Sequence, residues 1–300
     1  MCRFVFYKGP PITIASLLTE PSRSLIKQSI ASTESEEPLN GDGFGVAWYA
    51  PQLSHEPAAF RAVTPAWNNM NLLDLARVTR TPTMLAHVRA ATRGQPVTEL
   101  NCHPFTAGRY AFMHNGDIGG FQHIRRELLA TLSDRAFASI KGSTDSETLF
   151  AIFLDQVWKL PEIQTGLMIA DALRAAVRSL EGLQREKCVK EFNYLNISLT
   201  NGEQSVALRY TNDEAKNASS LHVHTGRRYV CRGGICRMIG PAEGEGAVII
   251  SSEVLSDDPG WQMVPVNHLV TVSKLRTVEV LPADIVPAES DMKGQRVNSN

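Results

Sequence analysis

The residue with the most distinctive chemistry is Cys2, which follows Met1 at the head of the apolar run Arg3 to Tyr7. If Met1 is removed, one residue carries both a thiol and a free α-amino group. A thiol with a pKa of about 8.5 is a modest nucleophile, and an α-amine with a pKa of about 8 can take its proton directly or through a water. A strand behind Cys2 would hold the nucleophile rigidly. Taken alone, the pair also fits a frayed terminus with an incidental cysteine.

Arg89 is a candidate for binding a carboxylate. It stands at the end of a strand predicted for residues 83–88, with Thr92 and Gly94 close behind. The guanidinium group suits a carboxylate because it donates two parallel hydrogen bonds. A surface salt bridge is the more common role of a single arginine.

Asn115 and Gly116 follow another short strand. Asn-Gly after a strand is first of all a turn signal. The functional alternative is an oxyanion hole, in which the Asn115 amide and the Gly116 backbone N–H point at one oxygen. Loss of one such donor typically slows a reaction by about 10²- to 10³-fold.

Asp145 is placed in the first turn of a predicted helix, and Thr144 and Glu147 have capping-box spacing. A carboxylate at this position interacts favourably with the helix dipole. The functional alternative is a carboxylate that binds the ammonium group of a substrate.

Short strands and amphipathic helices are expected to position these residues. The glycine-rich loop from Asn40 to Gly43 precedes a buried strand; it lacks the lysine and the following helix of a phosphate loop and is more typical of a hairpin turn. Lys8 to Pro11 is predicted to be a turn. Helical spacing covers residues 14–18, 25–30, 72–76, 120–132 and 166–181, with a further helix from 144, and later strands are predicted at 194–200, 204–210, 228–231, 247–251 and 262–273.

This order of elements predicts one α+β domain, residues 1–287, with mostly antiparallel sheet and segregated helices, and a polar, mobile tail at 288–300. The chain has 300 residues, 43% of them hydrophobic, and a net charge of −1, so charge favours neither nucleic acid nor a membrane surface. The sequence contains neither a signal peptide nor an apolar run of about 20 residues. Five scattered cysteines fit a reducing, cytoplasmic location better than a disulfide framework.

Together, the candidate residues resemble the class II glutamine amidotransferases, which are N-terminal-nucleophile hydrolases. Within that family they are similar to the amidotransferase-like subunits of the fungal cytosolic glutathione-degradation complex. The family resemblance rests on Met1-Cys2, Asn40-Gly41-Asp42-Gly43, His87-x-Arg89 with Thr92 and Gly94, His114-Asn115-Gly116, and Ser143-Thr144-Asp145. The narrower resemblance rests on residues 64–69, 101–105 and 142–147 and on Ser252-Glu253.

The resemblance implies a four-layer αββα sandwich and a role for each candidate. Cys2 is the nucleophile and its α-amine the base, while Asn115 and Gly116 form the oxyanion hole. Arg89, with Thr92, binds the substrate α-carboxylate and Asp145 binds its α-ammonium. Arg93 stands where relatives often have His or Tyr, which bears on substrate preference. No cofactor or metal is implied.

In these implied roles, the residues recognise the glutamate half of a γ-glutamyl substrate. They do not determine which leaving group is attached to it. The resemblance favours glutathione hydrolysis with a metallopeptidase-like partner subunit. The alternatives are a glutaminase that supplies ammonia to a synthase, a γ-glutamyl hydrolase of a thiol biosynthetic intermediate, and an inactive scaffold subunit.

Two other sites are weaker alternatives. His222 and His224 with Cys231 and Cys236 have residue types suited to structural zinc, although such residues in a β region more often pack. A Cys102–His103 protease dyad is disfavoured, because neighbours along a strand point to opposite faces.

Overall fold

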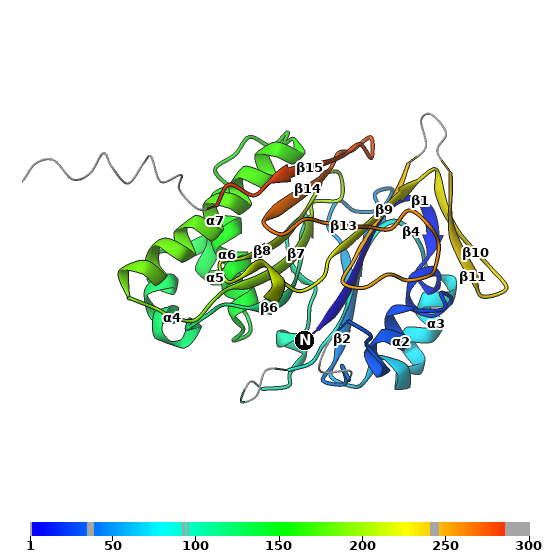
Figure 1. Cartoon of the computed structure of the whole chain (residues 1–300), viewed down its shortest axis with the longest axis horizontal. Coiled ribbons are helices and arrows are strands. Elements are labelled where there is room, and N and C mark those ends of the chain that lie inside the picture. Colours follow the sequence, from blue (N-terminus) through cyan, green and yellow to red (C-terminus); the bar gives the residue numbers. More distant parts are fainter. Residues whose placement is uncertain (1, 35–38, 92–93, 95, 241–245, 286–300) are drawn as a thin grey trace, which may run out of the picture.

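The computed structural model describes residues 2–34, 39–91, 94, 96–240 and 246–285; Met1, Thr92 and the tail at 288–300 lie outside these ranges. Two antiparallel sheets face each other, and helices cover the outer face of each (Figure 1). The fold is therefore the four-layer αββα arrangement that the resemblance implied. None of the described helices has both the length and the apolar character needed to cross a membrane.

The first sheet has seven strands in the order β13-β9-β12-β1-β4-β2-β3. Both neighbours of β1 pair with it antiparallel. The strands are β1 (Arg3–Thr13), β2 (Phe44–Trp48), β3 (Ala58–Ala62), β4 (Arg80–Val88), β9 (His222–Gly226), β12 (Ala247–Ser251) and β13 (Gln262–Met263).

The second sheet has six strands in the order β15-β14-β8-β7-β6-β5, and a separate hairpin pairs β10 with β11. The sheet strands are β5 (Phe105–Ala107), β6 (Tyr110–Asp117), β7 (Tyr194–Thr200), β8 (Ser205–Thr211), β14 (His268–Val272) and β15 (Val278–Pro282); the hairpin strands are β10 (Arg228–Arg232) and β11 (Ile235–Ile239).

The helices divide between the two outer layers (Figure 1). α1 (Ala15–Leu18), α2 (Leu25–Ile30) and α3 (Met70–Val78) cover the first sheet. α4 (Phe121–Ala130), α5 (Asp134–Ser139), α6 (Asp145–Val157) and α7 (Gly166–Glu186) form the other layer, and three short 3₁₀ turns lie at Ala66–Asn68, Glu99–Asn101 and Ala215–Asn217.

β1 shows how one apolar run serves two cores. Phe4 and Phe6 face the second sheet, whereas Val5 and Tyr7 face α1 to α3. Successive side chains on a strand point to opposite faces, so a strand covered on both faces reads as a continuous apolar run. The apolar start of the chain thus fixes β1 in the middle of the fold.

Three local predictions were wrong. Lys8 to Pro11 continues β1, with a register shift between Lys8 and Ile12 that accommodates the two prolines. Asn115 and Gly116 lie within β6 and pair with β7, so they are not a turn. The stretch 262–273 splits into β13 and β14 in different sheets, with Pro265 between them, because proline cannot donate to a strand ladder.

Gly116 is required by the close approach of β7. A Cβ atom there would lie 1.7 Å from the carbonyl oxygen of Tyr194, whereas one at Gly182, in α7, would have no neighbour within 4 Å. We expect Gly116→Ala to lower the free energy of unfolding by about 3 kcal/mol through overpacking. Gly182→Ala is the matched control and should raise it by about 0.5–1 kcal/mol. Urea denaturation measures both, and equal effects would contradict this packing.

Candidate active site

Strand register brings several of the predicted residues to one end of the first sheet. Arg3 and Phe44 each lie opposite Val88, so Cys2 before β1, Gly43 before β2 and Arg89 after β4 are neighbours. This follows from antiparallel pairing, which places the start of one strand beside the end of the next. The loop from Asn40 to Gly43, predicted to be a hairpin turn, instead leads into β2 and packs against Arg89.

The Cys2 thiol is half-buried and lies against the backbone of Ala90. Its Sγ atom is 3.4 Å from the Ala90 nitrogen and 3.4 Å from the Ala90 oxygen. Burial raises the pKa of the thiol, and the Ala90 N–H and the charges of Arg89 and Arg3 act in the opposite direction. A thiol with a raised pKa needs a base to become a nucleophile.

Arg89 is fixed by its backbone and leaves part of its guanidinium group unpaired. The Arg89 N–H donates to the Gly43 oxygen at 2.8 Å, and the Arg89 oxygen accepts from the Asp42 N–H at 3.0 Å. The side chain is 4% exposed, and its Nη2 atom donates to the Pro96 oxygen at 3.5 Å. Nη1 has no hydrogen-bond partner within the described ranges. A buried donor left unpaired costs stability, so this guanidinium group is suited to an incoming anion.

Asn115 connects the two sheets beside Cys2. Its Nδ2 atom donates to Ser252 Oγ at 3.4 Å, and the same Oγ accepts from the Phe4 N–H at 3.1 Å. Asn115 is buried, and its Oδ1 atom has no partner among the residues that the structure describes. Ser252 therefore links the amide to Phe4, two residues after Cys2, although Asn115 and Phe4 belong to different sheets.

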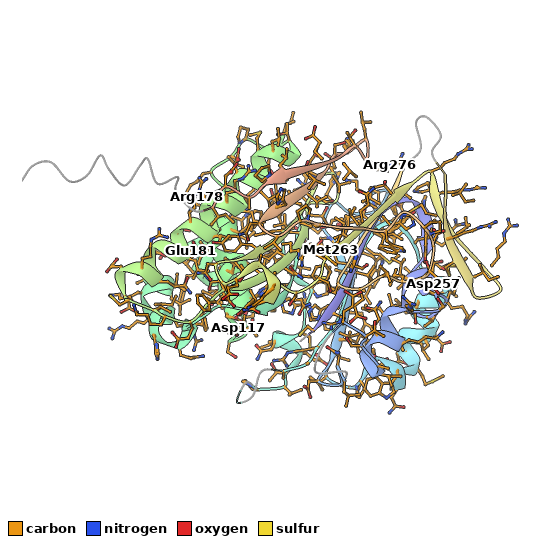
Figure 2. The ribbon with its side chains drawn as sticks, viewed as in Figure 1. Asp117, Arg178, Glu181, Asp257, Met263 and Arg276 are labelled. Carbon is orange, nitrogen blue, oxygen red and sulfur yellow. A yellow bond between two sulfur atoms is a disulfide. The ribbon has the colours of Figure 1, made fainter. Side chains whose placement is uncertain are left out.

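Asp145 lies at the start of α6, where the end of β6 reaches it. Its carboxylate accepts from the Ile118 N–H at 3.0 Å and from the Ser146 N–H at 2.8 Å. Asp117, at the end of β6 and labelled in Figure 2, adds a second carboxylate. Burial and then the negative charge of Asp145 raise the pKa of Asp117 to about 6. Two carboxylates at this end of β6 favour the binding of a cation. No motif in the sequence pointed to Asp117.

The capping-box prediction for α6 is half right. Thr144 Oγ1 accepts from the Glu147 N–H at 3.1 Å. The Glu147 carboxylate, however, accepts from the N–H groups of Lys141, at 2.9 Å, and Gly142, at 2.7 Å, rather than from Thr144. It therefore orders the loop that delivers Asp145.

A buried ion pair next to Cys2 helps to hold its backbone in place. Arg3 Nε lies 2.5 Å from Glu253 Oε1, and both side chains are 3% exposed. Arg3 Nη1 also donates to the Cys2 oxygen at 2.6 Å. The Glu253 carboxylate accepts from Ser32 Oγ and from the Thr33 N–H at 3.1 Å. Sequence periodicity cannot reveal a pair that is 250 positions apart. Only the family resemblance, which rests in part on Ser252-Glu253, pointed to this segment.

The buried histidines near the site are neutral. Burial lowers the pKa of His87 to about 3 and that of His103 well below its ordinary value. Their ring centroids lie 4.4 Å apart, with the ring planes tilted by 31°. Neither nitrogen of His103 has a hydrogen-bond partner in the described part of the chain, and the Cys102 thiol instead faces the Ala62 and Thr98 carbonyls. Cys102 and His103 therefore form no dyad.

The zinc alternative is not supported. His222 pairs with Glu34 at 3.1 Å and His224 with Asp258 at 3.0 Å. Cys231 and Cys236 lie opposite each other across the hairpin and form a disulfide, so the expectation of reduced cysteines is wrong for this pair. The one cluster of described residues that could hold a metal joins these two cysteines to Glu20, and the disulfide occupies both sulfur atoms.

Comparisons with known proteins show what this chain is similar to. The family profile described as class II glutamine amidotransferases matches residues 28–295, a range that begins after Cys2. The chain is 40% identical to the probable glutamine amidotransferase DUG3 of Saccharomyces cerevisiae, over 91% of this chain and 82% of the relative. It is 27% identical to the gamma-glutamyl-hercynylcysteine sulfoxide hydrolase of Mycolicibacterium smegmatis, over 93% and 98%. A solved glutamine aminotransferase class-II domain protein from Silicibacter pomeroyi superposes with a TM-score of 0.64 at 26% identity, covering 95% of this chain and all of that one.

The Arg3–Glu253 pair predicts a dependence of stability on pH. Burial acts to raise the pKa of Glu253, but hydrogen bonds from Ser32 and Thr33 and the charge of Arg3 lower it from 4.5 to about 2. A lowered pKa contributes stability that is present above about pH 4.5 and is lost as pH falls toward 2. Glu253→Gln leaves Arg3 without its counter-charge, and we expect a loss of about 3–5 kcal/mol at pH 7.

Urea denaturation at pH 7 and pH 3 tests this expectation. The loss caused by Glu253→Gln should be smaller at pH 3, because the Glu253 carboxyl of the unfolded chain is then protonated and the pair contributes less to stability. Glu162→Gln, at an exposed position, is the control and should change stability by less than about 0.5 kcal/mol. If Glu253→Gln had the same free energy of unfolding as the wild type at pH 7, the ion pair would not contribute to the stability of the fold.

Proposed function

Because the chain belongs to the class II glutamine amidotransferases, we propose that it hydrolyses γ-glutamyl amide bonds with Cys2 as an N-terminal nucleophile. The observation that carries this proposal is the contact of the Cys2 thiol with the backbone of Ala90, the residue after Arg89. The charge of Arg89 acts on the thiol, and its buried Nη1 lacks a partner within the described residues. A nucleophile next to an anion site matches a substrate with both an amide carbonyl and an α-carboxylate.

The mechanism begins after removal of Met1. The α-amine of Cys2 takes the thiol proton, and Sγ adds to the γ-carbonyl carbon. The resulting oxyanion accepts hydrogen bonds from the Asn115 amide and the Gly116 N–H. The protonated amine then gives its proton to the leaving nitrogen, the C–N bond breaks, and a γ-glutamyl thioester remains. Water, deprotonated by the same amine, hydrolyses the thioester to glutamate and restores the thiol.

Substrate recognition is assigned to charged groups around the nucleophile. Arg89 pairs with the α-carboxylate, with help from Thr92, which lies outside the described residues. Asp145 pairs with the α-ammonium. Since the Asp145 oxygens are already held by two backbone N–H groups, the carboxylate is oriented before the substrate arrives.

We favour glutathione as the substrate, in the cytosol, with a metallopeptidase-like partner subunit. The support is the 40% identity with DUG3 together with the segments that resemble the fungal glutathione-degradation branch. A γ-glutamyl thiol intermediate is the second candidate, because the chain is also 27% identical to a gamma-glutamyl-hercynylcysteine sulfoxide hydrolase over nearly its whole length.

The oxyanion role of Asn115 is tested by Asn115→Asp. This change keeps the side-chain shape but replaces the donor amide with an acceptor, so kcat should fall by about 10²- to 10³-fold with a small change in KM. Thermal unfolding of the variant checks that its fold is intact. An unchanged kcat, or a loss confined to KM, would remove Asn115 from the mechanism.

The leaving group is tested by comparing substrates. Purified chain, alone and with the metallopeptidase-like partner, is assayed with glutathione and with glutamine. We expect a higher kcat/KM for glutathione, with glutamate and cysteinylglycine formed in equal amounts. A higher kcat/KM for glutamine, with ammonia released, would support the glutaminase alternative. No hydrolysis of either by the complex, with Cys2 free at the N-terminus, would support an inactive scaffold subunit.

A further inference from the structure

The hairpin of β10 and β11 lies at the outer side of the molecule, away from the amino-terminal end of β1 (Figure 1). Residues 226–240 contain four arginines and no aspartate or glutamate. The whole chain has a net charge of −1, so this basic character is local. The reaction proposed above makes no use of the hairpin.

One face of the hairpin alternates arginine with aliphatic residues. Strand register places each arginine opposite an aliphatic side chain on the other strand. The six side chains line a hollow of about 400 Å³. We name this surface the arginine face; it consists of Arg228, Val230, Arg232, Ile235, Arg237 and Ile239.

The opposite face of the hairpin is anchored to the body of the protein. Tyr229 and Cys236 are buried in the core between the first sheet and its helices. The Cys231–Cys236 disulfide joins the two strands. Gly233 and Gly234, with φ of 57° and 79°, form the turn, and positive φ at both central positions is typical of tight hairpins. The arginine face is therefore held toward solvent, where Ile235 is 72% exposed.

The arginines of this face have no acidic partner in the described ranges: neither an ion pair nor a side-chain hydrogen bond involves Arg228, Arg232 or Arg237. By contrast, the exposed Arg77 and the half-buried Arg174 each pair with an aspartate three positions away. An unpaired cationic row beside exposed aliphatic side chains complements a surface that is both acidic and apolar.

The residue types favour a protein over a nucleic acid. Proteins that bind single-stranded nucleic acid place aromatic side chains between their basic ones so that bases can stack on them. The arginine face has no aromatic residue, and Tyr229 is buried behind it. Aliphatic side chains between arginines suit the alternate side chains of an extended peptide instead.

We propose that the arginine face binds an extended acidic segment of a partner protein. Arg228 and Arg232 are four positions apart on one strand, about 13 Å. Two carboxylates four residues apart on an extended segment have the same spacing. The side chain midway between them meets Val230, so the segment carries acidic, aliphatic and acidic residues at every second position.

The probe for this proposal is a fluorescent nine-residue peptide with glutamate at positions one, five and nine, valine at three and seven, and serine between. Anisotropy at low salt should show saturable binding that weakens as salt is added. Arg232→Glu and Arg237→Glu should each weaken binding by about tenfold or more. Arg126→Glu, at an exposed site on α4, should leave it within about twofold. Ile235→Ser should weaken binding by about threefold or more and leave its salt dependence unchanged.

Several outcomes would overturn the proposal. The wild-type chain could show no saturable binding of the peptide. A peptide with lysine in place of glutamate could bind equally well, or Arg126→Glu and Arg237→Glu could weaken binding equally. Tighter binding of single-stranded RNA or of phosphatidylserine vesicles, lost in Arg237→Glu, would assign the face to another class of partner. A dimer in sedimentation velocity that Arg237→Glu dissociates would assign it to a second copy of the chain.

Discussion

The pairing of β1 between β12 and β4 is the constraint on which the rest of the site depends. Because both neighbours run antiparallel to it, the residues that precede β1, follow β4 and follow β12 meet at one end of the sheet. Cys2, Arg89 and Ser252 occupy those three places. The strand is buried on both faces, so neither its register nor the position of Cys2 can shift without exposing one of two cores.

The second sheet completes the site through a few polar contacts. Asn115 reaches Ser252, and His87 Nε2 lies 3.3 Å from the His114 oxygen, so both contacts cross between sheets near Cys2. The guanidinium group of Arg89, whose Nη1 has no partner among the described residues, stands on the cysteine side. The carboxylates of Asp117 and Asp145 stand at the end of β6. Under the proposed function, this separation of charge serves a substrate with a carboxylate and an ammonium group on one carbon.

The parts of this structure that depend on local pattern could be predicted from the sequence. Helical spacing gave α4 and α7, although α7 extends to Glu186, and apolar runs gave β7, β8 and β12. Short elements such as β3 and α5 were missed, because so few residues carry little periodicity. Long-range features were inaccessible for a different reason: Glu253 meets Arg3 and Cys231 meets Cys236 only once strand order and register are set. The candidate site came from the family resemblance, since each residue alone had a more common structural explanation.

The proposed mechanism requires Cys2 to become the amino terminus and to act as the nucleophile. The direct measurement is the intact mass of the purified protein before and after exposure to diazo-oxo-norleucine, a γ-glutamyl electrophile, followed by peptide mapping. We expect loss of the Met1 mass and one adduct, located on Cys2, that Cys2→Ser abolishes. A chain that retains Met1 and carries no adduct on Cys2 would contradict the mechanism.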